Sequence, residues 1–452
     1  MAFTDEQVML CLAALSYRGY LDASPGHTNA VRLAIARGLQ TLAPVRDAWD
    51  IVWGPACYRA PVTVFDDTLV YVVRCRLTPT RYVVVIRGTN PVSAFDWLFG
   101  DLWTGRVMPW AYADQAGSIS LSAALGLTII QNLRAAGPQT AAAAPAVSAA
   151  VATGLGTAPA ASHSLSRWLG GLERAPVRAL RERCVTELQG LVEHGSAAPL
   201  ETAEQRVQAL AAFWQSGARQ RLLDLVDEAA RLTGRLDLAV FALVEDEMRL
   251  QVSLGAGVDL RTFLASAVKQ AGDSLDIIVT GHSKGGGLAS TVALWLADTQ
   301  GTNVAETEQW DPDGRATIRC FSYAGPTAGD EAFAGHSNSV IGARCRRIAN
   351  ALDVVPQAWA VSDLRKIPSL YAPSIPPIPG MAELIEIIAS TVGPLRYTQI
   401  ATGEVFAGKV NPGLPLFLAQ VVYQHLEAYL QALGLTAYGI TTATFFDPTQ
   451  FA

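Results

Sequence analysis

Residues 275–287 read Leu-Asp-Ile-Ile-Val-Thr-Gly-His-Ser-Lys-Gly-Gly-Gly, and this stretch decides the fold. Its first six residues are mostly apolar or β-branched, which predicts a buried strand. Gly281 and Gly285 flank Ser283 in a Gly-x-Ser-x-Gly turn, the pattern of a nucleophile elbow when a helix follows. The glycines are needed because a Cβ there would collide with the neighbouring strand and helix. The pattern therefore predicts Ser283 as a nucleophile facing the N–H groups of a helix N-terminus.

Strand and helix signals alternate around this turn. The expected strands lie at residues 69–73, 82–86, 275–280, 318–323 and 345–349, and a helix is expected at 287–298. Such alternation predicts a mainly parallel sheet flanked by helices. Together with the elbow, it predicts an α/β-hydrolase fold whose core comes from residues 1–106 and 258–452.

Residues 107–257 are expected to be a large, mostly helical cap or lid inserted into that core. Asp114 and Arg134 carry the only charges from residue 107 to residue 166, and residues 135–161 contain 13 alanines in 27 positions. Apolar residues at three- and four-residue steps then predict amphipathic helices at 173–195 and 201–232. A stretch so poor in charge must be buried or face something apolar.

Composition and charge exclude several classes of protein. The 452 residues are 50% hydrophobic and 16% charged, with a net charge of -6, a pI near 5.6 and a mean hydropathy of +0.24. The high hydropathy is typical of an interfacial protein and equally of an alanine-rich chain. Without a basic run, nucleic acid is not an expected partner. The six cysteines have no metal-ligand spacing, so no metal or cofactor is expected.

The chain start carries two acids, Asp5 and Glu6, where a secretory signal needs positive charge. No apolar run reaches the ~20 residues of a transmembrane helix. The expected location is therefore the cytoplasm, or outside the cell by a route that needs no such signal. The oligomeric state is not predicted.

A serine nucleophile needs a base, and the histidines that follow it are few. In this fold the triad order along the chain is serine, acid, histidine. Of the six histidines, only His336 and His425 follow Ser283 at a useful distance, because His282 is held within the elbow. His336 lies in an expected polar loop, whereas His425 follows every candidate acid. His425 is therefore the predicted base.

Asp353 is the favoured acid. It follows the strand expected at 345–349, and the loops after the strands of an α/β sheet carry its functional residues. Asp330 and Asp363 are the alternatives. The acid would fix the imidazole tautomer and stabilise the imidazolium.

Four stretches and a C-terminal segment together resemble the class 3 lipase family. They are Val85-Ile86-Arg87-Gly88-Thr89 with Asp96-Trp97, Val279 to Gly286, Ser322-Tyr323-Ala324-Gly325-Pro326 with Phe333-Ala334, Ile348-Ala349-Asn350 with Asp353 to Pro356, and His425-Leu426-Glu427-Ala428-Tyr429. The resemblance covers about residues 45–106 and 255–430. Lys284 departs from it, because the family usually carries leucine there.

The resemblance implies roles for the site residues. Ser283, Asp353 and His425 would form the triad, and Thr89 and the backbone N–H of Lys284 would form the oxyanion hole. Asp101 would orient the Thr89 loop.

The implied activity is hydrolysis of carboxylic esters, above all acylglycerols, through an acyl-enzyme. Lipid or ester substrate would be met at a lipid–water interface, with residues 107–110 and 119–130 as the part of the lid that touches the lipid. One alternative is a phospholipase, such as an exported effector. The other is a catalytically silent protein that binds lipid or a partner with the same fold.

Overall fold

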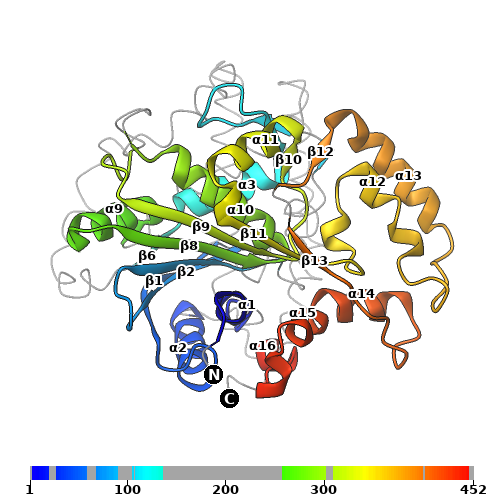
Figure 1. Cartoon of the computed structure of the whole chain (residues 1–452), viewed down its shortest axis with the longest axis horizontal. Coiled ribbons are helices and arrows are strands. Elements are labelled where there is room, and N and C mark those ends of the chain that lie inside the picture. The colour runs from blue at the N-terminus through cyan, green and yellow to red at the C-terminus, as the bar shows by residue number, and fades with distance from the viewer. Residues whose placement is uncertain are drawn as a thin grey trace, which may run out of the picture.

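A central sheet of seven strands runs through the protein in the order β1–β2–β3–β8–β9–β11–β13 (Figure 1). This computed structural model describes residues 3–19, 27–58, 68–89, 104–105, 107–135, 257–301, 309–400 and 403–446. The strands are Trp49–Tyr58 (β1), Thr68–Cys75 (β2), Arg81–Ile86 (β3), Leu275–His282 (β8), Ala316–Tyr323 (β9), Cys345–Asn350 (β11) and Glu404–Phe406 (β13). The first three are antiparallel, and from β3 onwards each pairs in parallel with the next. The predicted α/β-hydrolase architecture is confirmed.

The five strands predicted from the sequence fall within β2, β3, β8, β9 and β11. Val84 and Ile86 belong to the core on one face of the sheet, whereas Val83 and Val85 belong to the core on the other face. This alternation follows from the two-residue period of a strand. A strand covered on both faces needs apolar residues at every position, which explains the unbroken run in β3.

Helices cover both faces of the sheet, and the two termini of the described chain lie on the same face (Figure 1). One face carries Leu121–Asn132 (α3), Leu260–Ala271 (α9), Lys284–Asp298 (α10) and Glu331–Val340 (α11). The other carries Asp5–Leu15 (α1), His27–Thr41 (α2), Glu427–Ala432 (α15) and Ala443–Phe446 (α16). The predicted helix at 287–298 is the main part of α10.

A third apolar cluster lies beyond the β13 edge of the sheet. It joins Val361–Leu364 (α12), Met381–Val392 (α13) and Phe417–His425 (α14), with Tyr371 and Phe417 in ring contact at its centre. α14 leads directly from this cluster into α15 on the second face of the sheet. The end of α14 therefore lies beside the β13 edge of the sheet (Figure 1).

The prediction that residues 107–110 and 119–130 meet lipid is wrong. Val107–Pro109 (β4) and Ser118–Ser120 (β5) join a second sheet in the order β12–β10–β5–β4, with Gly329–Asp330 (β10) and Tyr397–Thr398 (β12). Trp110 is 4% exposed, and α3 is buried along most of its length. The absence of charge in α3 therefore reflects burial, because a helix that is apolar on every side packs inside the core.

Two short strands flank residues 136–256, which lie outside the described part of the chain. Arg134–Ala135 (β6) pairs antiparallel with Val258–Asp259 (β7), which brings residues 135 and 258 side by side. Residues 107–135, assigned above to the insertion, therefore belong to the described core. The alanine-rich stretch from 136 to 161 and the helices predicted at 173–195 and 201–232 lie outside the described residues.

Within the part of the chain that the structure describes, no helix is long and apolar enough to cross a membrane.

Candidate active site

Ser283 occupies a strained turn between β8 and α10. Its backbone has φ 64° and ψ -132°, a positive φ that a residue with a side chain rarely adopts. Ser283 N–H donates to the carbonyl of Tyr323 on β9 at 2.9 Å, which fixes the turn against the neighbouring strand. The strand, turn and helix predicted from the sequence are all present. Such a turn presents the serine at the end of the sheet, ahead of a helix N-terminus.

The two glycines of the motif are required by close backbone packing. A Cβ on Gly281 would lie 2.2 Å from the carbonyl oxygen of Gly285, and a Cβ on Gly285 would lie 2.4 Å from the carbonyl oxygen of Ile86. Both neighbours are main-chain atoms, which cannot move aside as a flexible side chain can. The elbow therefore tolerates only glycine at these two positions.

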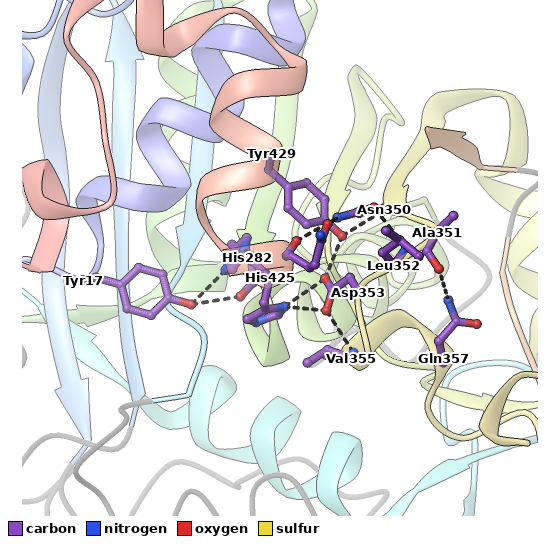
Figure 2. Close-up of polar contacts among 11 residues, drawn as sticks. Tyr17, His282, Asn350, Ala351, Leu352, Asp353, Val355, Gln357, His425 and Tyr429 are labelled. Atoms are coloured by element: carbon purple, nitrogen blue, oxygen red, sulfur yellow. Dashed lines mark hydrogen bonds and ion pairs between the residues drawn. The ribbon is translucent and has the colours of Figure 1, made fainter. Parts of the chain in front are cut away.

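Asp353 follows β11 in a loop and is fully buried. One carboxylate oxygen accepts from the Val355 N–H at 3.0 Å, and the other accepts from the Tyr429 hydroxyl at 2.8 Å. His425 Nδ1 lies 2.9 and 3.1 Å from the two oxygens (Figure 2). These hydrogen bonds provide partners for both oxygens of a carboxylate that has no access to water.

His425 is the last residue of α14, and its side chain is 15% exposed. A carboxylate only accepts hydrogen bonds, so the contact with Asp353 places the neutral ring's proton on Nδ1 and leaves Nε2 able to accept one. Among the described contacts, the side-chain hydrogen bonds of His425 run to Asp353 and none joins it to Ser283. Such bonds often tighten only when substrate binds.

Four of the five predicted site residues line one cavity of about 480 Å³: Thr89, Ser283, Lys284 and His425. Asp353, the fifth, lies behind His425. Lys284 is the first residue of α10 and is 8% exposed. Thr89 follows β3, the strand that pairs with β8. Most of the remaining wall is apolar and includes Leu288, Val355 and Trp359. A cavity of this size and polarity suits a small apolar ligand.

The comparisons with known proteins agree with this geometry. The family model of the class 3 lipases, described as Lipase (class 3), matches residues 243–362, which include the elbow and Asp353. The crystal structure of M37 lipase is similar with a TM-score of 0.63 and 26% identity, over 99% of this chain and 98% of that one. Both findings support assignment to the class 3 lipase family. The chain is accordingly a carboxylic ester hydrolase. The comparison with curated proteins gives no match.

The alternative candidates for the triad have other partners. His336 lies in α11 and not in the polar loop expected for it, because Asp330 caps that helix by accepting from the Phe333 N–H at 2.8 Å. The His336 ring lies 2.9 Å from a carboxylate oxygen of Asp298, away from the cavity. Asp363 binds Lys366 at 2.6 Å.

Asp101, expected to orient the Thr89 loop, lies outside the described residues. Among the described residues, no group of three histidine, cysteine or acidic side chains could hold a metal ion.

Three residues of this site were missed from the sequence. Tyr429 donates to Asp353, and its spacing of four from His425 was the one available signal. His282 was excluded as the base but given no role. Tyr17 contacts the His282 ring at 3.2 Å from the far N-terminal end of the chain, and no sequence pattern pointed to it (Figure 2).

His282 remains neutral at ordinary pH. Burial and, to a smaller extent, the neighbouring His425 lower its pKa from 6.5 to about 3, against the opposite effect of its hydrogen bond to the His425 carbonyl. The ring therefore donates or accepts hydrogen bonds without bringing a charge beside the candidate base.

We expect acid to destabilise this lipase through His282. The unfolded chain binds a proton at a pKa near 6.5, whereas folded His282 binds it only near 3, so the unfolded state holds more protons between these values. The free energy of unfolding should fall as the pH drops through this window, by up to about 1.4 kcal/mol per pH unit from this one group. Urea unfolding of the wild type and His282→Gln at pH 7, 6, 5 and 4 isolates the contribution. Parallel pH dependences in the two proteins would contradict it.

Proposed function

We propose that this chain hydrolyses acylglycerol esters through a triad of Ser283, His425 and Asp353. The observation that carries the proposal is the shared cavity: Ser283 stands in a strained elbow, and His425, held at Nδ1 by buried Asp353, lines the same space. A serine beside a histidine that a carboxylate orients is the arrangement of nucleophilic acyl transfer.

The proposed reaction has two halves. His425 Nε2 takes the proton from Ser283 Oγ as this oxygen attacks the ester carbonyl carbon. The tetrahedral oxyanion is held by the backbone N–H of Lys284 and by Thr89, and it collapses to the acyl-enzyme as His425 returns the proton to the leaving alcohol. Water, deprotonated by the same histidine, then attacks the acyl carbon, and the bond to Ser283 Oγ breaks as His425 returns the proton to this oxygen and the carboxylic acid leaves.

The apolar surface that leads into the cavity supports a lipid substrate. No acidic or basic side chain other than His425 occurs from Val410 to Leu426. Leu418 and Val422 are 65% and 58% exposed on α14, and Val422 and Leu426 line the cavity. Residues four apart share one face of a helix, so this apolar face runs from solvent to the reaction site. A free aqueous ester needs no such face, whereas an acyl chain leaving a lipid surface does.

Hydrolysis of phospholipids is a second candidate, and Lys284 is the observation that favours it. A cation lines the cavity at the position where the family usually carries leucine. A phosphate next to the cleaved ester would be attracted by this ammonium group in surroundings of low polarity.

A substrate panel with p-nitrophenyl esters, triacylglycerols and phospholipids tests both candidates. We expect p-nitrophenyl and triacylglycerol hydrolysis that disappears in Ser283→Ala. The variant Lys284→Leu keeps the backbone donor, so it should leave triacylglycerol hydrolysis intact and lower only phospholipid hydrolysis if the cation binds phosphate. Failure of the wild type to hydrolyse any carboxylic ester, with no labelling by a fluorophosphonate, would overturn the proposed function.

A further inference from the structure

His282 joins the nucleophile elbow to the backbone of the proposed base. Its Nε2 lies 2.8 Å from the carbonyl oxygen of His425, a residue 143 positions away (Figure 2). We propose that His282, oriented by Tyr17, is a positioning residue that sets the placement of the His425 imidazole relative to Ser283. The inference rests on the proposed function, because it concerns the geometry of that same triad.

The hydrogen bonds of His282 define its tautomer. A backbone carbonyl only accepts, so the Nε2 that faces His425 must carry the proton. In the neutral ring Nδ1 is then an acceptor. The Tyr17 hydroxyl, 3.2 Å from Nδ1 and 3.3 Å from the His282 carbonyl oxygen, is a donor shared between these two acceptors. Tyr17 thereby holds the ring in the one tautomer that can bind the His425 backbone.

Both ends of this connection are fixed in the fold. His282 ends β8, which pairs with β3 on one side and β9 on the other, so its Cα has little freedom relative to Ser283. His425 ends α14, and the last carbonyls of a helix have no partner within the helix. The His282 N–H provides that partner. A single hydrogen bond therefore fixes the end of the helix that carries the proposed base relative to the strand that leads into Ser283.

The neutral state of His282 is part of this role. The ring centroids of His282 and His425 are 4.7 Å apart. Tyr429 packs edge-on against the His282 ring, with the two centroids 5.8 Å apart. A positive charge on His282 would oppose the imidazolium that forms on His425 during the reaction. The burial that lowers the His282 pKa to about 3 keeps that charge away while the N–H donor is retained.

His282 cannot act as the base in place of His425. Its Nε2 proton is engaged with a carbonyl oxygen, and its Nδ1 faces Tyr17. Among the residues lining the cavity, His425 is present and His282 is not. The ring of His282 instead borders a separate small apolar space beside Leu430 and Phe445.

Replacement of His282 separates positioning from packing. His282→Leu removes the donor, whereas His282→Gln keeps an N–H near the position of Nε2. We expect His282→Leu to lower kcat about 10- to 100-fold on a short soluble ester, because small misplacements of a catalytic group have effects of this size. KM should change less than about twofold, since substrate contacts remain. His282→Gln should recover most of the lost kcat.

The matched controls His336→Leu and His336→Gln remove a histidine that bonds to Asp298 outside the cavity, and they should keep wild-type kcat.

Three results would overturn the inference. These are wild-type kcat in His282→Leu, equal losses in the leucine and glutamine variants, and an equal loss in His336→Leu. If His282→Leu does not fold, Tyr17→Phe decides: a kcat reduced severalfold supports the positioning role, and an unchanged kcat overturns it. Ser283→Ala keeps this test distinct from the proposed function. Hydrolysis that survives in Ser283→Ala would contradict the proposed triad. Loss of hydrolysis in Ser283→Ala, together with full activity in His282→Leu, would contradict only the positioning role of His282.

Discussion

Replacing Ser283 with alanine is expected to lower kcat by about 10⁴-fold or more, and His425→Ala should do nearly the same. Asp353→Asn should also lower kcat by about 10⁴-fold, because an amide can donate to Nδ1 and so favours the wrong imidazole tautomer. The double variant Ser283→Ala/His425→Ala should lose little beyond either single one, since the three side chains act as one unit. Steady-state hydrolysis of p-nitrophenyl butyrate measures each effect.

The controls for this series are the rejected candidates. Asp330→Asn and Asp363→Asn change carboxylates that cap α11 and bind Lys366, so they should retain kcat within a few-fold of the wild type. Thermal unfolding of every variant separates a catalytic loss from a folding defect. Full activity in Asp353→Asn, with loss in Asp330→Asn or Asp363→Asn, would show that another carboxylate orients the base.

The second large effect is expected at the oxyanion hole. Thr89→Val keeps the size of the side chain but removes the hydroxyl, and it should lower kcat about 100- to 1,000-fold with little change in KM. We expect kcat to fall while KM changes little, because the donor is needed where negative charge develops in the transition state and much less in the bound ester. Thr89 follows β3 and lines the cavity with Ser283, as this role requires.

Thr89→Ser retains the hydroxyl and is the matched variant, expected within about tenfold of the wild type. Thr128→Val provides a control for the loss of a buried threonine hydroxyl elsewhere, since Thr128 donates to the Ala124 carbonyl inside α3. Equal kcat in Thr89→Val and Thr89→Ser would mean that the hydroxyl does not contact the oxyanion.

The local part of the site could be predicted from the sequence because its causes are local. The elbow needs glycine at 281 and 285 for backbone clearance, and the flanking strand and helix have clear patterns. Asp353 and His425 required an argument from chain order, and the sequence alone could not show that they meet. Their contact depends on α14 ending beside the loop after β11, which is a property of the tertiary packing.

Other features could not be predicted correctly, for physical reasons that the sequence does not reveal. The charge-free segment 119–130 predicts a surface that meets lipid, but such a segment is equally compatible with burial, and α3 is buried. The polar run Ala-Gly-His-Ser-Asn predicts a loop at His336, yet the Asp330 cap and the buried Phe333 hold the helix. Tyr17 approaches His282 from 265 positions away, a separation that no local pattern reports.

The pairing of β3 with β8 has a consequence for how the chain is made. Arg81 on β3 is bonded to Asp276 on β8, 195 positions later. At a synthesis rate of 5 to 20 residues per second, about 10 to 40 s separate the two strands on the ribosome. During that time the finished β1–β2–β3 meander presents Tyr82 to Ile86 as an unpaired, apolar edge, which is a template for aggregation. Overproduction of this protein should therefore be limited by the nascent chain, and slower translation at low temperature with added chaperones should raise the soluble yield more than mutations that stabilise the finished fold.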